Sequence, residues 1–247
     1  MRLAILSDIH ANLEALHACL EHAGRERAGE FVFPGDLVGY GADPVPCLET
    51  VQAYAARGAL VLRGNHDEAA RGGSVEGMND VAREAILWTR RRLDDAQCAF
   101  LAGLPFVARR DGVCFAHATP AAPERWGYIM SGRDAVRAIA AADAPITVVG
   151  HVHHQTLYFA ASNGGAGAFR PTAGRSIVLA ARRRWLAVCG SVGQPRDGNR
   201  AAAYAVLDLE RRTLTFHRVP YDYREAARKI RAAGLPERLA LRLETGR

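Results

Sequence analysis

Five short groups of oxygen and imidazole donors stand out because each one directly follows an apolar run. They are Asp8-Ile9-His10, Gly35-Asp36, Gly64-Asn65-His66-Asp67, His117 and Gly150-His151-Val152-His153. Asp, Asn and His side chains are ligands that divalent transition metals accept. Taken singly, each group has an ordinary alternative as a helix cap, a turn or a buried hydrogen-bonded histidine. Taken together they predict a pair of metal ions, a site type that commonly serves displacement at phosphorus.

The apolar runs that carry these groups alternate with helical patterns in the first part of the chain. Asn12 caps a predicted helix over residues 13–23, which Gly24 is expected to end. Asp43-Pro44 begins a second helix that ends at Gly58. The intervening strands are predicted at residues 2–7, 31–33 and 59–63. This β-α-β-α-β order predicts a parallel sheet, and ligands bind at the carboxyl ends of such strands.

The rest of the chain shows a change of pattern after His153. Before it, residues 68–78 look like a glycine-rich loop, Asn79 and Asp94 cap two helices, and Ser131-x-x-Asp134 resembles a capping box. Strands are expected at 112–116 and 146–149, followed by antiparallel strands at 156–160, 176–181, 184–189, 202–208 and 212–218. Residues 162–174 are predicted as a loop or hairpin tip, and helices at 222–233 and 236–244 close the chain. We find no linker, so residues 1–247 are predicted to form a single domain.

Residue spacing within the groups indicates how they bind. Asp8 and His10 are two positions apart, so in an extended segment both side chains leave one face and can chelate one ion; His151 and His153 repeat this spacing. Asp36 stands alone, and one carboxylate can bridge two ions. Asn65 offers a neutral carbonyl oxygen. The remaining histidines fit none of the groups and are expected to be structural: His17, His22, His154 and His217.

Composition excludes several classes of protein. No apolar run approaches the roughly 18–20 residues that span a bilayer, and the N-terminus lacks a signal-peptide cleavage pattern, so we expect a cytoplasmic protein. Five scattered cysteines without a C-x-x-C spacing argue against disulfides and a zinc cluster. The net charge is +6, but the arginines are spread along the chain, which makes a dedicated nucleic-acid groove an unfavoured interpretation.

The donor pattern D-x-H, G-D, G-N-H, H and G-H-x-H over residues 2–153 resembles the calcineurin-like metallophosphoesterase superfamily. The stretch from Ser191 to Gly198 is similar to the small bacterial phosphodiesterase branch of that superfamily. This resemblance implies an α/β fold, a two-sheet α/β/β/α sandwich with metals at the strand ends. It also implies hydrolysis of a phosphodiester, or of a small phosphomonoester, by a hydroxide that two metal ions activate.

Residue by residue, the resemblance implies one ion held by Asp8, His10 and His153, and a second held by Asn65, His117 and His151. Asp36 would bridge them, and His66 would be the catalytic general acid. Mn²⁺ is the expected metal, with Fe, Zn, Ni or Co as alternatives. The expected partner is a small phosphorylated substrate such as a nucleotide, not a membrane. Among nearby loop residues, Arg196 and Tyr128 are the candidates for substrate contact; Arg125 and Trp126 share those loops.

Departures from the family pattern limit the choice of activity. Protein phosphatases of the superfamily continue the second motif as G-D-x-x-D-R-G, whereas Gly35-Asp36 is followed here by Leu37-Val38-Gly39-Tyr40-Gly41. The missing aspartate and arginine count against protein phosphatase activity. A nuclease or a dinucleoside polyphosphate hydrolase remains an alternative with the same site. A non-catalytic scaffold, as in the retromer subunit of this fold, would predict lost donors, yet every donor and His66 are present.

Overall fold

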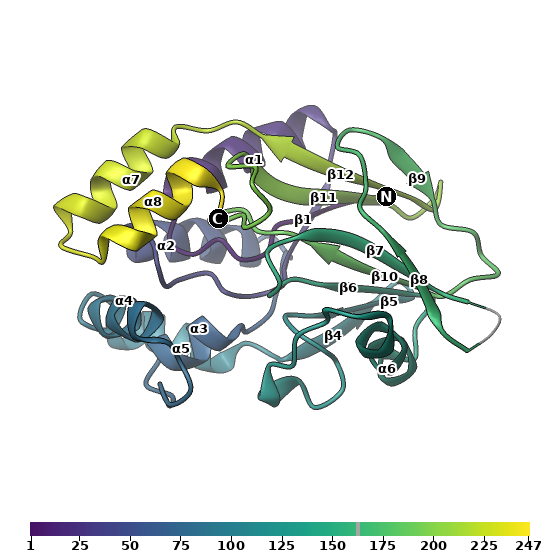
Figure 1. Cartoon of the computed structure of the whole chain (residues 1–247), viewed down its shortest axis with the longest axis horizontal. Helices are drawn as coiled ribbons and strands as arrows, with labels where there is room; N and C mark the ends of the chain where they lie inside the picture. The colour runs from purple at the N-terminus through teal and green to yellow at the C-terminus, as the bar shows by residue number, and fades with distance from the viewer. Residues whose placement is uncertain (162–163) are drawn as a thin grey trace.

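The computed structural model describes residues 1–161 and 164–247, which form two six-stranded sheets with helices on the outside (Figure 1). The first sheet has the order β3 (Leu60–Val61), β2 (Glu30–Phe33), β1 (Arg2–Ile5), β11 (Ala202–Asp208), β12 (Thr213–Val219) and β9 (Ser176–Val178). The second has the order β4 (Val107–Arg110), β5 (Val113–Ala116), β6 (Ile146–Val149), β10 (Trp185–Cys189), β7 (Gln155–Ala160) and β8 (Ala166–Phe169).

Helices cover the outer faces of both sheets. The helices are α1 (Leu13–Arg25), α2 (Pro44–Ala55), α3 (Asn65–Ala70), α4 (Asp80–Arg90), α5 (Asp95–Gly103), α6 (Gly132–Ala142), α7 (Tyr223–Ala232) and α8 (Glu237–Thr245), with a 3₁₀ turn at Pro123–Arg125. Helix α6 covers the second sheet, and α7 and α8 form a C-terminal hairpin at one end of the molecule (Figure 1). Of the helices described here, none is long and apolar enough to cross a bilayer.

Strand periodicity explains the layered core. In β1, Leu3 and Ile5 point between the two sheets, where they meet side chains of β5, β6 and β10. Ala4 and Leu6 point the other way and pack under α1 and α2. Because successive side chains of a strand point to opposite faces, a strand buried on both sides reads as a continuous apolar run. The expected α/β/β/α sandwich is the fold observed.

Most local predictions are confirmed. β1, β2 and β3 pair in parallel, as do β5 and β6. Four of the five predicted caps form hydrogen bonds: the side chains of Asn12, Asn79, Asp94 and Ser131 each accept from a backbone N–H three residues on, whereas Asp43 makes no such bond. The later strands pair largely as antiparallel neighbours, although β10 also pairs in parallel with β6.

Other local predictions fail at two element boundaries, and two strands are missed. Helix α1 runs through Gly24 to Arg25, and the left-handed residue that follows is Arg27 (φ 57°). The glycine-rich segment 68–78 begins inside α3, because the Gly-Asn-His-Asp group is a helix N-terminus. Strand β4 was not predicted, and β8 lies inside the predicted loop 162–174, of which residues 162 and 163 lie outside the described part. Both are edge strands with weak apolar patterns, and β8 is drawn into the sheet by pairing with β7.

The carboxyl ends of β1 and β6 approach each other so closely that only glycine fits between them. A Cβ atom at Gly150 would overlap Ser7 Oγ and the Asp8 carboxylate. We expect Gly150→Ala to lower the free energy of unfolding by about 1–3 kcal/mol, the usual cost of overpacking. Gly103→Ala, at the open end of α5 where a Cβ meets nothing within 4 Å, is the matched control. Urea unfolding of the metal-free proteins measures the free energy of unfolding of both variants. Equal midpoints for Gly150→Ala and wild type would contradict the close approach of Gly150 to Ser7 and Asp8.

Candidate metal centre

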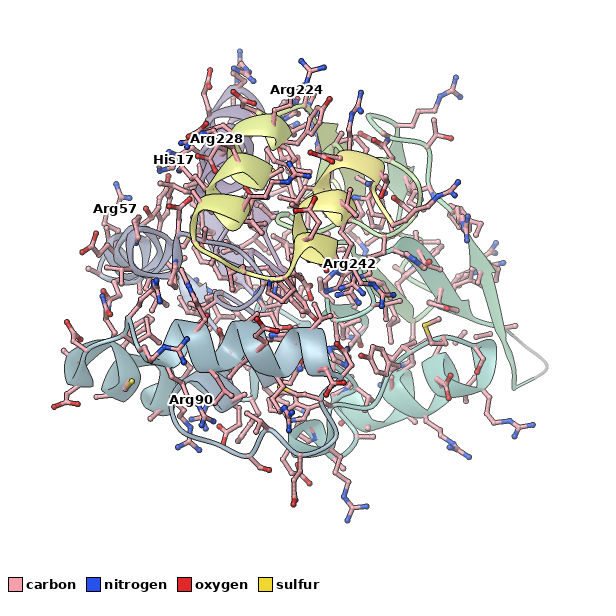
Figure 2. The ribbon with its side chains drawn as sticks, turned by 60° about the vertical axis from the view of Figure 1, so that its left-hand side comes forward. His17, Arg57, Arg90, Arg224, Arg228 and Arg242 are labelled. Atoms are coloured by element: carbon pink, nitrogen blue, oxygen red, sulfur yellow. The ribbon has the colours of Figure 1, made fainter. Side chains whose placement is uncertain are left out.

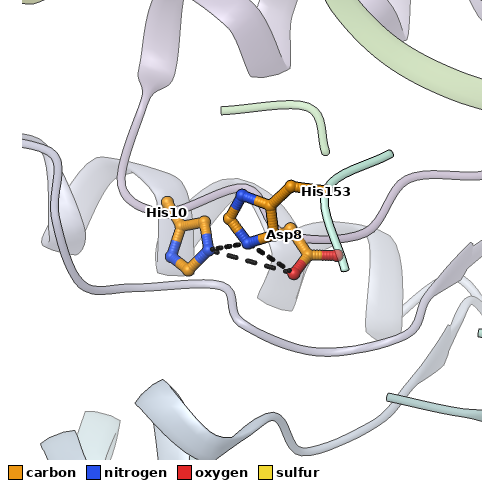
Figure 3. A group of neighbouring side chains, drawn as sticks. All are labelled: Asp8, His10 and His153. Carbon is orange, nitrogen blue, oxygen red and sulfur yellow. Dashed lines mark hydrogen bonds and ion pairs between the residues drawn. The ribbon is translucent and has the colours of Figure 1, made fainter. Parts of the chain in front are cut away.

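Asp8, His10 and His153 form the first donor group (Figure 3). The Nε2 atom of His153 lies 3.1 Å from Asp8 Oδ1 and 3.0 Å from His10 Nε2. His10 Nε2 lies 3.9 Å from the same carboxylate oxygen. All three side chains are buried, and two segments far apart in the sequence supply them, the end of β1 and the turn after β6. This arrangement matches the predicted first ligand set.

His117, His151 and Asn65 form the second donor group. His117 Nε2 lies 3.2 Å from Asn65 Oδ1 and 3.1 Å from His151 Nδ1. His117 directly follows β5, His151 follows β6, and Asn65 is the first residue of α3. The neighbouring histidines of the Gly-His-x-His motif thus enter different groups, as the family resemblance implies.

Asp36 lies between the two groups. Its Oδ2 atom is 3.7 Å from His10 Nε2 and 3.3 Å from His117 Nε2. Its other oxygen, Oδ1, accepts a hydrogen bond from the backbone N–H of His66 at 2.8 Å. A carboxylate held in this way presents one oxygen to both sets of nitrogens, which is the placement expected of a bridging ligand.

Backbone carbonyls orient three of the imidazoles. Nδ1 of His10 lies 3.3 Å from Val38 O, Nδ1 of His117 lies 3.1 Å from Pro34 O, and Nδ1 of His153 lies 2.6 Å from Gln194 O. A carbonyl accepts only from an N–H, so each Nδ1 carries a proton and each Nε2 atom faces the donor groups. Metal-binding histidines are commonly fixed by this kind of outer hydrogen bond.

The backbone at the donors is not extended, contrary to the prediction for the D-x-H and H-x-H spacings. Positive φ angles occur at Asp8 (55°), His10 (50°), Asp36 (54°), His151 (67°) and His153 (64°). Non-glycine residues adopt this left-handed region at a cost, and such strain gathers at functional sites. The tight turns direct successive donors inward, so chelation by Asp8 and His10 follows from a turn and not from strand geometry.

The electrostatics favour ionised carboxylates beside mostly neutral imidazoles. Burial raises the pKa of Asp36, but the charges of His117 and His66 outweigh it and hold this pKa well below its usual range. Burial lowers the pKa of His151 to about 3 and that of His10 well below its usual range. For His117 burial is outweighed by Asp36, which raises the pKa to about 9, so a cation entering there displaces a proton.

Two buried nitrogens in this region have no hydrogen-bond partner within residues 1–161 and 164–247: His151 Nε2 and His66 Nδ1. Leaving a buried polar atom unpaired costs about 1–3 kcal/mol. The fit to metal comes from the other ring nitrogens: inward-facing imidazole nitrogens beside ionised carboxylates suit a pair of divalent cations such as Mn²⁺, which accept mixed oxygen and imidazole ligands. The residues that would hold the ions are Asp8, His10, Asp36, Asn65, His117, His151 and His153.

His66 lies beside this centre, with a ring nitrogen within 4.8 Å of ligand atoms of His10 and Asp36. Its ring meets His10 edge-on at 4.9 Å and contacts Tyr40 at 4.4 Å between centroids. Burial lowers the pKa of His66 to about 4, although the charge of Asp36 opposes this. His66 is therefore neutral near pH 7 in the free protein, whereas the sequence analysis assumed the protonated form.

Both predicted substrate residues lie at the edge of the donor groups. The exposed Tyr128 stacks on His151 with centroids 4.1 Å apart at 22°. The Arg196 side chain lies over Tyr40 and donates to Gln194 Oε1 at 2.8 Å. Trp126 meets His117 at 6.0 Å, and Arg125 precedes it in the 3₁₀ turn. His154, predicted to be structural, has Nε2 2.8 Å from the backbone oxygen of Arg196 and so supports that loop.

Sequence reasoning missed three contributors. Tyr40 packs against His10 and His66. Asp67 accepts hydrogen bonds from the backbone N–H groups of Leu37 and Gly64, which tie the second and third motifs together. Its position three residues after Gly64 is that of a capping-box acid, a signal that was available. Arg242, from α8, donates to Gln194 Oε1 at 3.3 Å, and no local pattern marks it.

Comparison with known proteins agrees with this geometry. A family model described as the calcineurin-like phosphoesterase superfamily domain matches residues 1–212. The chain belongs to the calcineurin-like phosphoesterase superfamily. This superfamily member is 35% identical over 250 residues to an uncharacterized protein of Methanocaldococcus jannaschii, covering 99% of this chain and 98% of the relative.

Two solved structures share this fold over the whole of this chain. A metallophosphoesterase from Sphaerobacter thermophilus is 36% identical with a TM-score of 0.90, covering 100% of both chains. A hypothetical protein from Pyrococcus horikoshii has a TM-score of 0.81 at 18% identity, covering 100% of this chain and 98% of the other, a likeness that shows the fold alone. The α7–α8 hairpin, which lies beyond the matched family domain, is included in both alignments by their full coverage of this chain.

The bridging position of Asp36 predicts a strong dependence of metal content on its charge. We expect Mn²⁺ added to the metal-stripped protein to stabilise it by about 2.7 kcal/mol per site at a hundredfold excess over Kd. Asp36→Asn should lose most bound Mn²⁺ and this stabilisation, while Asp80→Asn, at an exposed position on α4, should keep both. Elemental analysis after dialysis and thermal unfolding are the measurements. Wild-type Mn²⁺ content in Asp36→Asn would refute the bridging role.

Proposed function

We propose that this protein is a metal-dependent phosphodiesterase that hydrolyses small phosphorylated substrates, with nucleotide diesters as the first class to test. Membership of the superfamily supports phosphoric ester hydrolysis. The observation that carries the proposal is the single oxygen of Asp36 between two sets of metal donors. Divalent ions bound there, with Mn²⁺ as our first choice, would supply Lewis acidity toward the phosphoryl oxygens and lower the pKa of water.

His66 is the group we assign as general acid toward the leaving oxygen. It lies against the donor groups without belonging to the proposed ligand set, and Gly39 packs directly on its Nδ1 edge, where a Cβ would clash. Because its pKa is low in the free protein, His66 must take up a proton from solvent when the substrate binds. A phosphate anion next to the ring favours imidazolium, since an opposite charge within a few ångströms stabilises the charged form. His66 would therefore act as an acid only when substrate is bound, because its imidazole is neutral in the free protein.

Two guanidinium groups at the rim support an anionic substrate. Arg196 and Arg242 both donate to the amide oxygen of Gln194, beside Tyr40. No carboxylate forms a salt bridge with either arginine within the described residues. Burial, together with the like charge of Arg196, lowers the pKa of Arg242. Figure 2 shows Arg242 on α8. Two such charges without an acidic partner favour binding of phosphate oxygens.

Aromatic side chains at the rim support a nucleotide as the substrate. Tyr128 is 56% exposed and presents its ring over His151, and Trp126 lies in the same loop. Exposed aromatic faces stack on nucleobases, at about 1–3 kcal/mol per base. A phosphodiester has a second esterified group that this aromatic loop is suited to hold, whereas a simple phosphomonoester substrate such as a sugar phosphate has no such ring.

Hydrolysis of bis-p-nitrophenyl phosphate beside p-nitrophenyl phosphate, after metal stripping and reconstitution with Mn²⁺, tests the proposal. We expect diester turnover that requires metal and disappears in Asp36→Asn. A marked preference for the monoester would overturn the diester assignment. Metal binding without turnover on either ester, or on nucleotide diesters, would instead favour a scaffold.

His66→Asn tests the general acid. We expect unchanged Mn²⁺ content and a fall in kcat of roughly 10²–10⁴-fold, the usual contribution of general acid catalysis. The loss should be smaller for the bis-p-nitrophenyl ester than for an alkyl diester, because nitrophenolate leaves without needing a proton. Steady-state kinetics on both esters gives the answer. Equal losses for good and poor leaving groups would argue against proton donation by His66.

Arg242→Gln tests the anion-binding rim. We expect KM to rise about tenfold, equivalent to 1.4 kcal/mol of binding, with a smaller change in kcat, because the guanidinium is assigned to substrate oxygens away from the scissile bond. Arg228→Gln, at an exposed position of α7, is the control for the loss of one positive charge (Figure 2). If Arg228→Gln raises KM equally, the effect comes from net charge and the rim assignment fails.

A further inference from the structure

A second cluster of metal-binding side chains lies away from the donor groups described above. His22 is near the end of α1, Glu26 is the residue that follows this helix, and His217 lies in the middle of β12. One candidate ligand atom from each of the three lies within 4.8 Å of the others. The cluster combines two imidazoles with one carboxylate, a ligand set found in zinc sites with three protein ligands.

His217 is the least accessible member and the one without a partner. His217 is only 6% exposed, and its Nε2 atom has no hydrogen-bond partner in the described part of the chain. The His217 ring stacks on Tyr204, with centroids 5.0 Å apart, and its centroid lies 4.9 Å from that of the His22 ring. A buried, unpaired imidazole nitrogen costs stability unless a ligand satisfies it.

His22 and Glu26 complete the set in a form suited to a cation. Nδ1 of His22 lies 2.7 Å from the hydroxyl oxygen of the fully buried Tyr204. When Nδ1–H donates to this oxygen, the Nε2 lone pair of His22 is free to bind a metal, as in other histidine sites fixed by an outer hydrogen bond. Among residues 1–161 and 164–247, the Glu26 carboxylate takes part in no salt bridge or hydrogen bond that would compete.

We propose that His22, Glu26 and His217 form a separate mononuclear site for a cation of the zinc class. Zn²⁺ accepts two imidazole nitrogens and one carboxylate oxygen and leaves a fourth position for water. The half-buried position of His22 and Glu26 gives the ion access from the surface, while His217 supplies the buried ligand.

This site is distinct from the proposed catalytic centre. Helix α1 begins beside that centre, where Asn12 donates to Gly193 O, and ends at the His22–Glu26–His217 cluster. Ten residues of helix separate Asn12 from His22, or about 15 Å. An ion at the cluster would fasten the end of α1 to the β11–β12 hairpin, on which the helix packs. Its role would therefore be to hold the helix whose other end supports the strand ends with the donors.

His217→Phe is the sharpest test, because phenylalanine keeps an aromatic ring in the stack and lacks the imidazole nitrogens. Dialysis of the full-length protein against Zn²⁺, followed by elemental analysis, should give one zinc fewer per chain in His217→Phe and in the isosteric Glu26→Gln than in wild type. His17→Phe, on the exposed face of the same helix, should leave the zinc content unchanged (Figure 2). In the Asp36→Asn background, where the proposed catalytic centre is impaired, one zinc should remain and should disappear when His217→Phe is added.

Stability measurements guard against a folding defect. In metal-free buffer, His217→Phe should unfold at a denaturant concentration equal to or above that of wild type, since it removes an unpaired buried nitrogen. In the Asp36→Asn background, Zn²⁺ should raise the melting temperature, and His217→Phe should abolish that rise. Equal zinc content in wild type, His217→Phe and Glu26→Gln would overturn the proposal and identify the cluster as a histidine pair beside a carboxylate without metal.

Discussion

Burial of two carboxylates beyond the ends of β1 and β2, neighbouring strands of the first sheet, is the constraint on which this structure depends. Asp8 and Asp36 are almost completely inaccessible, and an isolated buried charge is so costly that it must be paired or neutralised. Imidazoles and backbone N–H groups surround both: the backbone of His151 donates to Asp8, and that of His66 donates to Asp36. The fold thus holds negative charge among imidazoles, and this costly burial is the physical basis of the candidate metal centre.

Close packing around these carboxylates determines the loops. Gly150 and Gly64 allow the backbone to approach Asp8 and Asp36, and no side chain fits at either position. Asp67 then fixes the loop of Asp36 to the N-terminus of α3 through two backbone N–H groups. Its pKa is raised to about 7, chiefly by burial and by the Asp36 charge, so negative charge is crowded on this side of the centre. Left-handed turns and glycines occur together here because both let the backbone come close to the buried carboxylates, so that the donor side chains converge.

Outside the centre, the chain adds features that the shared motifs do not contain. The α7–α8 hairpin brings Arg242 to Gln194, and the loop after β5 brings Tyr128 onto His151. Lys229, the one lysine of the sequence, fastens α7 to Glu14 of α1 and Asp43 before α2. The same aspartate was expected to cap α2, but its side chain makes no capping hydrogen bond. Positive charge and aromatic faces at the rim, over an acidic interior, are suited to a phosphorylated ligand with a ring.

The sequence by itself determined most of the elements, most helix caps and the candidate donor residues, because apolar periodicity and capping act over a few residues. It also predicted that the donors meet, since parallel strands end at one edge. Tertiary structure decided the rest. The left-handed turns at Asp8 and His153, the division of His151 and His153 between groups, and the place of Arg242 all depend on contacts between distant segments. The same is true of the His22–Glu26–His217 cluster. Its two histidines and one glutamate belong to no sequence motif and come together only because α1 packs on β12. Local sequence patterns carry no information about such contacts, which form only when the two sheets and their helices pack against one another.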